Sequence, residues 1–524
     1  MAHAVNVNGH ENEAIGESTS LLSSQQQAPL KSTKLSKSRC TWPWIRVVAL
    51  CITIAIIVST GEQLFMAPKI RLYESIACTD HYRHHNSSLI GKDGLVPEKL
   101  CKVNPVQEKI AIIQGWQECF DSIPALLLPV AYGHLADTYG RKWITVLGVL
   151  GYTLASAWIL FVLGILHLPL EFVWLSSLFH LIGGGPVMAT TLVTTIVADV
   201  APPDKRSSAF FYRFTSELIA ECVVPPIASI LMKRTPWIPL VTAIGFMTLG
   251  ILMTLIIPET LPVEVPQPEY IASNGAQREV EISSVDMGLS SHGPKPYKWE
   301  NWINTSKEFF DFVTRDKLVV AFLFAFLALR VGRQAYHIFL QYVSKRYHWS
   351  LAQAGFLLSL RAGVNIVLFT AVLPFIATFT LSKTKAISKD LRIARVSIIL
   401  MILGTIVVSF SPTPVPMIIG LTIYTLGAGF PPILRSLTTA VVESHHASKT
   451  SDIGRLYALI SVMEGLGSLI AGPGIAWTFT LGISLGSNWG IEVLWMEAEW
   501  YMVFGSRGIW VQTQGASSSF HQRE

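Results

Sequence analysis

Ionisable side chains stand inside long apolar stretches of this 524-residue chain, at spacings that bring several of them onto one helical face. Arg213, Glu217 and Glu221 are spaced at four-residue intervals, and Asp121 follows Glu118 by three residues. Residues three or four apart on a helix are neighbours, so Arg213 and Glu217 are close enough to form an ion pair. A charge within a bilayer is costly unless it is paired or faces water, so each of these residues is a candidate for a solute or proton pathway.

The second half of the chain carries arginines in its apolar stretches. A guanidinium binds a carboxylate through two parallel hydrogen bonds, so Arg330 and Arg435 are expected to bind an anionic solute. Glu217 or Glu221, removed from water, is expected to carry a coupled proton. The alternative is that these acids and arginines pair with one another and only hold the helices in register. The remaining candidates within the apolar stretches are Glu62, Arg333, Arg361 and Glu464.

The composition is typical of a membrane protein. Hydrophobic residues make up 51% of the chain and charged residues 14%, against roughly 25% charged residues in soluble domains. Apolar blocks recur that are long enough to cross a bilayer core of about 30 Å as helices. We expect eleven spans, at residues 45–66, 109–132, 143–166, 172–199, 208–231, 237–257, 317–341, 354–379, 396–411, 414–438 and 453–479.

The spans fall into two groups. Residues 45–257 are expected to form an N-terminal six-helix bundle, and residues 317–480 a C-terminal bundle with five clear spans. The fold class is therefore an all-α polytopic membrane protein.

Three polar segments flank the bundles. Residues 1–44 are rich in Ser and Gln and are expected to be a disordered cytosolic tail. The linker at 258–316 is expected to be cytosolic, with an amphipathic helix lying on the membrane surface. Residues 481–524 form an atypical C-terminal tail, because three glutamates between 491 and 499 make a twelfth span doubtful.

Basic residues collect in the gaps on the side of the N-terminus, which is therefore expected to be cytosolic. The first outer loop, at 67–108, contains Cys78, Cys101 and a glycosylation sequon at Asn86. A disulfide between the two cysteines and a glycan on Asn86 fit an oxidising compartment. The alternative is two free thiols and an unused sequon. A second sequon, at Asn304, lies in the cytosolic linker and is expected to stay unmodified.

The polar gaps contain none of the motifs that would indicate a soluble enzyme, a metal site or a nucleic-acid partner. The net charge of +5 is scattered over these gaps, which argues against nucleic acid as a partner. No cysteine pair or Cys/His cluster has the spacing of a metal site, and no P-loop, GxSxG, HExxH or dinucleotide fingerprint occurs. We therefore expect a chain that is not an enzyme and needs neither metal nor cofactor.

The segment at 133–142, between the second and third spans, resembles the signature GxLaDrxGrk of the major facilitator superfamily. The resemblance implies two pseudo-symmetric six-helix bundles of the major facilitator fold, with an alternating-access cavity between them that moves a small solute. The matching residues are Gly133, Asp137, Gly140, Arg141 and Lys142.

The same resemblance assigns a gating role to this segment. Asp137 lies at a helix end and can accept a hydrogen bond from the N-terminus of another helix, where the dipole is positive. By resemblance, that partner is the start of the eleventh span, at Arg455, so that the contact closes an inner gate. The alternative is a turn of fixed shape without a switching role. The chain is most similar to fungal members related to the proton-coupled folate transporter group, through 435–437 and 472–473.

Secondary active transport of a small organic solute is therefore the expected function, with protons as the coupling ion and a monomer as the working unit. Uptake and efflux both remain open, although 223–226 lacks the glycine-rich motif of proton-antiport drug pumps. A transporter-like solute sensor is the alternative from another class. The plasma membrane is the expected location, and the acidic dileucine sequence at 17–22 makes the vacuolar membrane the alternative.

Overall fold

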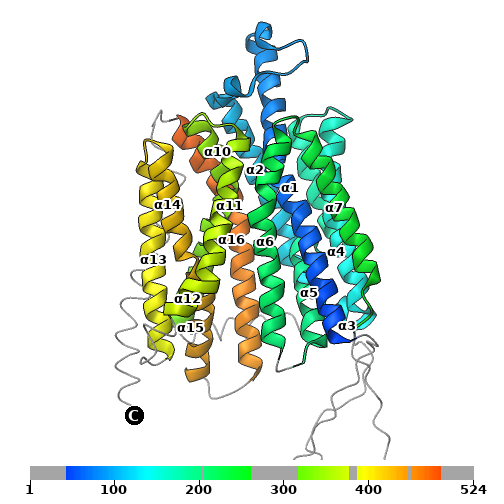
Figure 1. Cartoon of the computed structure of the whole chain (residues 1–524), viewed down its shortest axis with the longest axis vertical. Coiled ribbons are helices and arrows are strands. Elements are labelled where there is room, and N and C mark those ends of the chain that lie inside the picture. The colour runs from blue at the N-terminus through cyan, green and yellow to red at the C-terminus, as the bar shows by residue number, and fades with distance from the viewer. Residues whose placement is uncertain (1–42, 203–204, 261–316, 377–385, 446–449, 485–524) are drawn as a thin grey trace, which may run out of the picture.

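The computed structural model describes residues 43–202, 205–260, 317–376, 386–445 and 450–484, which contain helices and no strand (Figure 1). Nine helices in these ranges are long and apolar enough to cross a membrane, or eleven spans if each of two bent helix pairs counts as one. The all-α membrane fold is therefore confirmed. The expected tail, the amphipathic helix of the linker and the segment of the doubtful twelfth span lie outside the described residues.

The N-terminal bundle is built by the first six spans, and the second and fourth of these are each divided into two helices. Its elements are α1 (Trp44–His85), η1 (Ser87–Leu89), η2 (Glu98–Lys102), α2 (Asn104–Leu127), α3 (Pro129–Tyr139), α4 (Arg141–Gly164), η3 (Leu170–Leu181), α5 (Gly185–Val200), α6 (Arg206–Met232) and α7 (Trp237–Ile256).

The C-terminal bundle has the same kind of broken spans. Its elements are α9 (Lys317–Gln334), α10 (Tyr336–Arg346), α11 (Leu351–Val367), η4 (Leu368–Val372), α12 (Leu373–Phe375), α13 (Ala386–Phe410), α14 (Pro414–Leu426), η6 (Gly427–Gly429), α15 (Phe430–His445) and α16 (Thr450–Ser484).

Helix α1 is much longer than the sequence predicts. The expected loop at 67–108 was wrong in its first part, because the helix continues without a break through Pro68 to His85. Its outer part is amphipathic, and the buried side chains of Leu72, Tyr73 and Ala77 pack into the core of the bundle. Forty-two residues span about 63 Å as a helix, more than the bilayer core. The outer end of α1 therefore rises beyond the neighbouring helices (Figure 1).

The fourth span is divided by glycines. Gly183, Gly184 and Gly185 have φ values of 79°, 80° and 70°, in the left-handed region that glycine adopts without steric cost. The residues before them form the twelve-residue 3₁₀ helix η3, which is long for an element that rarely exceeds three or four residues. The span thus consists of a 3₁₀ outer half and an α-helical inner half.

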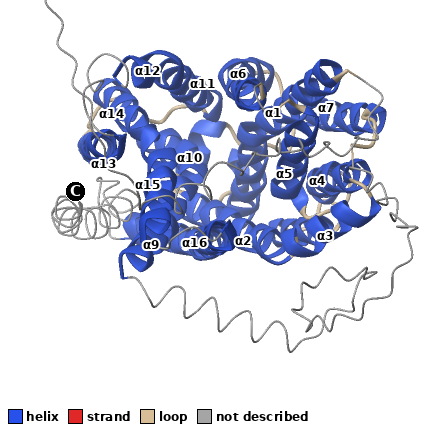
Figure 2. Cartoon of the chain, turned by 90° about the horizontal axis from the view of Figure 1, so that it is seen from below, coloured by secondary structure: helices blue, strands red, loops and turns tan. Residues whose placement is uncertain are grey.

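The two bundles meet along two helix pairs, α2 with α16 and α6 with α11 (Figure 2). Small residues allow the first pair to touch: a Cβ atom on Gly115 of α2 would lie 2.5 Å from the carbonyl oxygen of Gly472 on α16. Any side chain at this position must push the bundles apart.

We expect Gly115→Val to destabilise the protein by about 1–3 kcal/mol, because extra carbon atoms in a filled contact force the backbones apart. Gly245→Val is the control, since a Cβ atom there meets open space. Thermal unfolding of both variants in detergent tests this. Equal melting temperatures would contradict the close contact.

Candidate functional site

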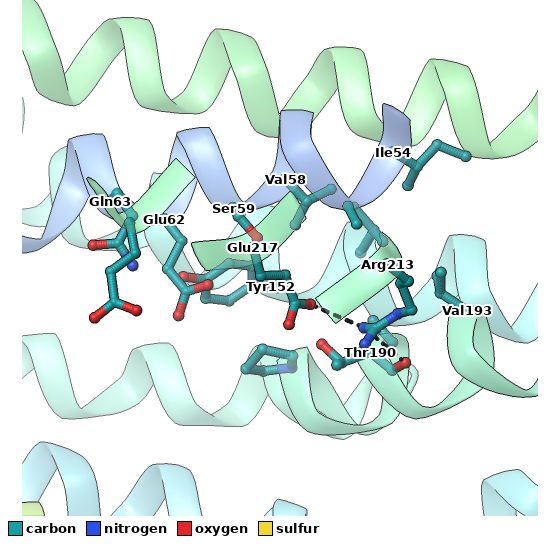
Figure 3. A pocket seen from close by; sticks show the side chains of 15 residues that line it. Ile54, Val58, Ser59, Glu62, Gln63, Tyr152, Thr190, Val193, Arg213 and Glu217 are labelled. Atoms are coloured by element: carbon teal, nitrogen blue, oxygen red, sulfur yellow. Dashed lines mark hydrogen bonds and ion pairs between the residues drawn. The ribbon is translucent and has the colours of Figure 1, made fainter. Parts of the chain in front are cut away.

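A cavity of about 270 Å³ lies inside the N-terminal bundle, between α1, α4, α5 and α6 (Figure 3). Four of the charged residues singled out within the apolar stretches of the sequence line it: Glu62, Arg213, Glu217 and Glu221. Tyr152, Gln63 and Thr190 add polar groups, and Val58 and Val193 add apolar surface. The cavity can therefore hold a small molecule that has both polar and apolar parts.

The spacing of Arg213 and Glu217 predicts their ion pair correctly. The guanidinium donates to the Glu217 carboxylate at 2.9 Å and to the backbone oxygen of Thr190 at 3.3 Å. The Arg213 side chain is only 8% exposed, so the pair is fixed in the cavity wall.

Glu62 differs from the other acids of the cavity. Its carboxylate points into the cavity from α1 (Figure 3) and is exposed there. Within the described part of the chain it forms neither an ion pair nor a hydrogen bond, while Glu217 and Glu221 are each paired with an arginine. Glu62 is thus the cavity carboxylate that is available to a proton or a solute.

Two acids of the N-terminal bundle bind the C-terminal bundle. Glu221 of α6 forms an ion pair with Arg361 of α11. Glu118 of α2 accepts a hydrogen bond from the side chain of Gln334, on α9, at 2.5 Å. These residues therefore join the bundles near mid-membrane.

Arginines expected to bind a solute have protein partners. Arg435 pairs with Glu464 at 2.5 Å, and Arg330 donates to the hydroxyl of Ser468. Arg333 is exposed. For Arg361 and Arg435, the structure shows the mutual pairing that was the alternative interpretation of the sequence.

Asp121 lies away from the cavity lining, between α2 and η3. Its carboxylate accepts a hydrogen bond from Ser177 at 2.5 Å and lies 3.4 Å from Nδ1 of His180. Sequence reasoning placed Asp121 beside Glu118 on one helix, but it did not bring His180 to it.

The signature at 133–142 forms a charged cluster at the junction of α3 and α4. Gly140, with φ of 108°, makes the turn between the helices. Arg141 forms ion pairs with Asp199, at the end of α5, and with Asp137 at 3.6 Å. The cluster thus ties the inner ends of three helices together.

Glu259 is a residue of this cluster whose role sequence reasoning missed. Its carboxylate accepts hydrogen bonds from the backbone N–H groups of Arg141 at 3.0 Å and Lys142 at 3.4 Å. These are unpaired donors at the positive N-terminus of α4. Its position just after α7 was the available signal.

Two residues of the signature, Gly133 and Asp137, have open surroundings. A Cβ atom on Gly133 would meet open space, so no close contact requires a glycine at this position. Asp137 has a side chain that is 69% exposed. The side chain of its expected partner, Arg455, lies outside the described residues, so the latch stays a prediction.

The outer ends of the bundles are joined by the short helix η2. Lys102 donates to Glu74 of α1 and to Ser344 of α10, each at 2.6 Å. Glu98 accepts from the backbone N–H of Leu351, the first residue of α11, at 2.8 Å. A carboxylate at a helix N-terminus is favoured by the dipole. We call Glu98 and Lys102 with these partners the outer seal.

A disulfide holds the outer seal to α1. Cys78 and Cys101, the pair expected to be oxidised, are linked, and Cys101 belongs to η2. Asn86 is exposed at the start of η1. Through Glu98 and Lys102, η2 thus links the two bundles at the end of the molecule where α1 extends beyond its neighbours.

The profile of the Major Facilitator Superfamily matches residues 115–472, more than half of the chain. The chain belongs to the Major Facilitator Superfamily. It is 35% identical over 481 residues to the MFS efflux pump atnC of Emericella nidulans, covering 91% of this chain and 89% of that one. It is 29% identical to the efflux pump ustT of Aspergillus flavus over 82% of this chain and 81% of that one.

Among solved structures, the nucleoside transporter NupG matches with a TM-score of 0.56 at 13% identity, covering 88% of this chain and 98% of that one. At this identity the match shows the fold alone. The superfamily and these relatives are transporters rather than enzymes, and members move small solutes across membranes. The finer resemblance to the proton-coupled folate transporter group is not supported by these relatives.

We expect Glu98→Ala to weaken the outer seal of this superfamily member and to raise the fraction of molecules that are open to the outside. Losing a hydrogen bond to a charged group costs about 1.5–3 kcal/mol. The measurement is the distance between spin labels at the outer ends of the two bundles.

The control is Asp93→Ala, which removes an exposed acid of the same outer loop. Unchanged distances in Glu98→Ala would show that the outer seal does not hold the bundles together.

Proposed function

We propose that this protein exports a small organic solute by alternating access, in exchange for protons that move in the opposite direction. The availability of Glu62 in the cavity carries the proposal. A single carboxylate can be neutralised by a proton or contact a solute, but it does not do both at once. Mutually exclusive binding at one site is the simplest physical basis of exchange. Each ligand shifts the equilibrium between two conformations only if it binds one of them more tightly than the other.

Efflux is favoured over uptake by two fungal relatives, both of which are named as efflux pumps. The polar and apolar lining fits an organic solute with both kinds of surface. The proposed working unit is a monomer. The plasma membrane is the location that export requires.

We expect Glu62→Gln to abolish proton-coupled export, because the amide cannot gain or lose a proton. Metabolites inside and outside cells that lack or overexpress the protein are compared at two external pH values, which identifies the solute. Export by the intact protein should rise as external pH falls, whereas export by Glu62→Gln should be at least about tenfold lower and insensitive to pH.

The control is Glu171→Gln, an exposed acid at the start of η3 outside the cavity. Export by Glu62→Gln with the pH response of the intact protein would contradict the role of Glu62. Solute accumulation inside the overexpressing cells would contradict export itself and favour uptake.

The orientation of the chain is part of the proposal: Asn86 is outside the cell and carries a glycan, while the N-terminus is cytosolic. Asn86 is exposed, and its loop contains the Cys78–Cys101 disulfide, which supports an oxidising compartment.

We expect Asn86→Gln to remove the mobility shift that a glycosidase causes on a gel. The control is Asn304→Gln, which changes the second sequon, outside the described residues, and should leave the shift intact. A shift that survives in Asn86→Gln and is lost in Asn304→Gln would reverse the orientation.

A further inference from the structure

A second ionisable group lies behind the wall of the cavity. His180 lies in the last turn of the 3₁₀ helix η3, and its side chain is 8% exposed. Its Nδ1 atom lies 3.4 Å from the Asp121 carboxylate, which also accepts a hydrogen bond from Ser177. Residues three apart in a 3₁₀ helix are eclipsed, so Ser177 and His180 both reach the same carboxylate of α2. We call Asp121 and His180 the buried dyad.

The other ring nitrogen of the buried dyad is unsatisfied. The Nε2 atom of His180 is buried and has no hydrogen-bond partner among the described residues. A buried polar atom without a partner is rare and costly, and it often marks a functional site. The neutral tautomer with its proton on Nδ1, the atom 3.4 Å from the Asp121 carboxylate, leaves a lone pair on Nε2, which is a place for a proton to bind.

The buried dyad lies between the cavity and a contact with the C-terminal bundle. Tyr152 lines the cavity with Glu62, and its ring centroid lies 6.2 Å from that of His180. One turn before Asp121 on the same helix, Glu118 binds Gln334 of the C-terminal bundle. A change of charge in the buried dyad therefore occurs between the cavity and a contact that joins the bundles.

The surroundings of the buried dyad supply both signs of charge. The groups that act on it electrostatically are Lys69 on α1 and Glu118 on α2, and the phenols of Tyr73 on α1 and Tyr152 on α4 lie beside it. Because the site is shielded from water, adding one positive charge has a larger effect on nearby contacts than it would have at the surface.

We propose that the Asp121–His180 pair holds a transported proton and makes the opening of the inner side dependent on pH. This inference rests on the proposed proton exchange and names a second residue pair that serves it. The proton enters from the cavity past Tyr152 and binds at Nε2, which converts the neutral imidazole beside the Asp121 carboxylate into an ion pair. Its return to the cavity reverses the change, so no other reactant is needed.

The test needs no knowledge of the solute, because protons are the probe. Spin labels are attached after Tyr139→Cys and Arg392→Cys, two exposed positions at the inner ends of α3 and α13. The other cysteines outside the disulfide are replaced by serine. The distance between the labels is measured in the full chain in lipid nanodiscs between pH 5 and 8. We expect the inner-open fraction of this labelled chain to change with pH around one midpoint.

His180→Gln and Asp121→Asn should each remove this midpoint, and the double variant should behave like either single one, because one partner alone cannot form the pair. Glu171→Gln is the control and should keep the midpoint. A glutamine can still donate to Asp121, so a purely structural role of His180 would leave the pH profile unchanged in His180→Gln. A retained midpoint would overturn the proposal.

Two further results separate this inference from the proposed function. If Glu62→Gln loses the pH response while His180→Gln keeps it, proton exchange stands and the buried dyad is not part of it. If the labelled chain with its dyad intact shows no response at any pH, proton exchange itself is overturned, and the inference with it. Should both dyad variants fail to fold, Ser177→Ala, which keeps both ionisable groups, must shift the midpoint, and an unchanged midpoint would overturn the inference.

Discussion

The cost of placing charge in a medium that cannot solvate it governs this structure. Within the spans a carboxylate or guanidinium must find a partner or face a cavity. Glu221 meets Arg361 across the two bundles, and Arg213 meets Glu217 within one helix. Once these pairs are made, Glu62 is the cavity acid left to respond to what enters. The charges that hold the bundles in register therefore also determine where transport chemistry can occur.

A second interaction, a carboxylate bound to the N-terminus of a helix, occurs at both ends of the spans. A helix N-terminus has unpaired N–H groups and a partial positive charge, and a carboxylate satisfies both. At the outer surface Glu98 binds the N-terminus of α11, which belongs to the other bundle. At the inner surface Glu259 binds the N-terminus of α4 within its own bundle. The first of these contacts joins the two bundles, whereas the second stays within one bundle.

Several spans are divided into shorter helices. The three glycines at 183–185 separate η3 from α5, so the helical backbone of the fourth span is interrupted there. His180 and Ser177, which contact Asp121, belong to the outer half of that span. Close packing at Gly115 and Gly472 fixes the neighbouring interface of α2 and α16. The residues that contact Asp121 therefore lie in one half of a broken span, and Asp121 itself lies on a helix of the α2–α16 interface.

Much of this protein is determined by its sequence alone. Apolar length and composition establish the spans, because each helix must satisfy its own backbone in lipid. Local spacing predicts the pair of Arg213 and Glu217, since residues four apart on a helix are neighbours. The signature at 133–142 predicts membership of the superfamily, and the match over residues 115–472 confirms it. All of these properties depend on residues that are close together in the chain or on composition.

Only the tertiary structure decided which distant groups meet. Glu221 with Arg361, Asp121 with His180, and Glu259 with the start of α4 come from different spans, and spacing within one helix says nothing about its rotation against another. The continuation of α1 to His85 also depended on packing, because its outer polar half is helical where one apolar face covers η2 and α2. The sequence places the charged residues on the helices, and the relative rotation of the packed helices determines which of them pair.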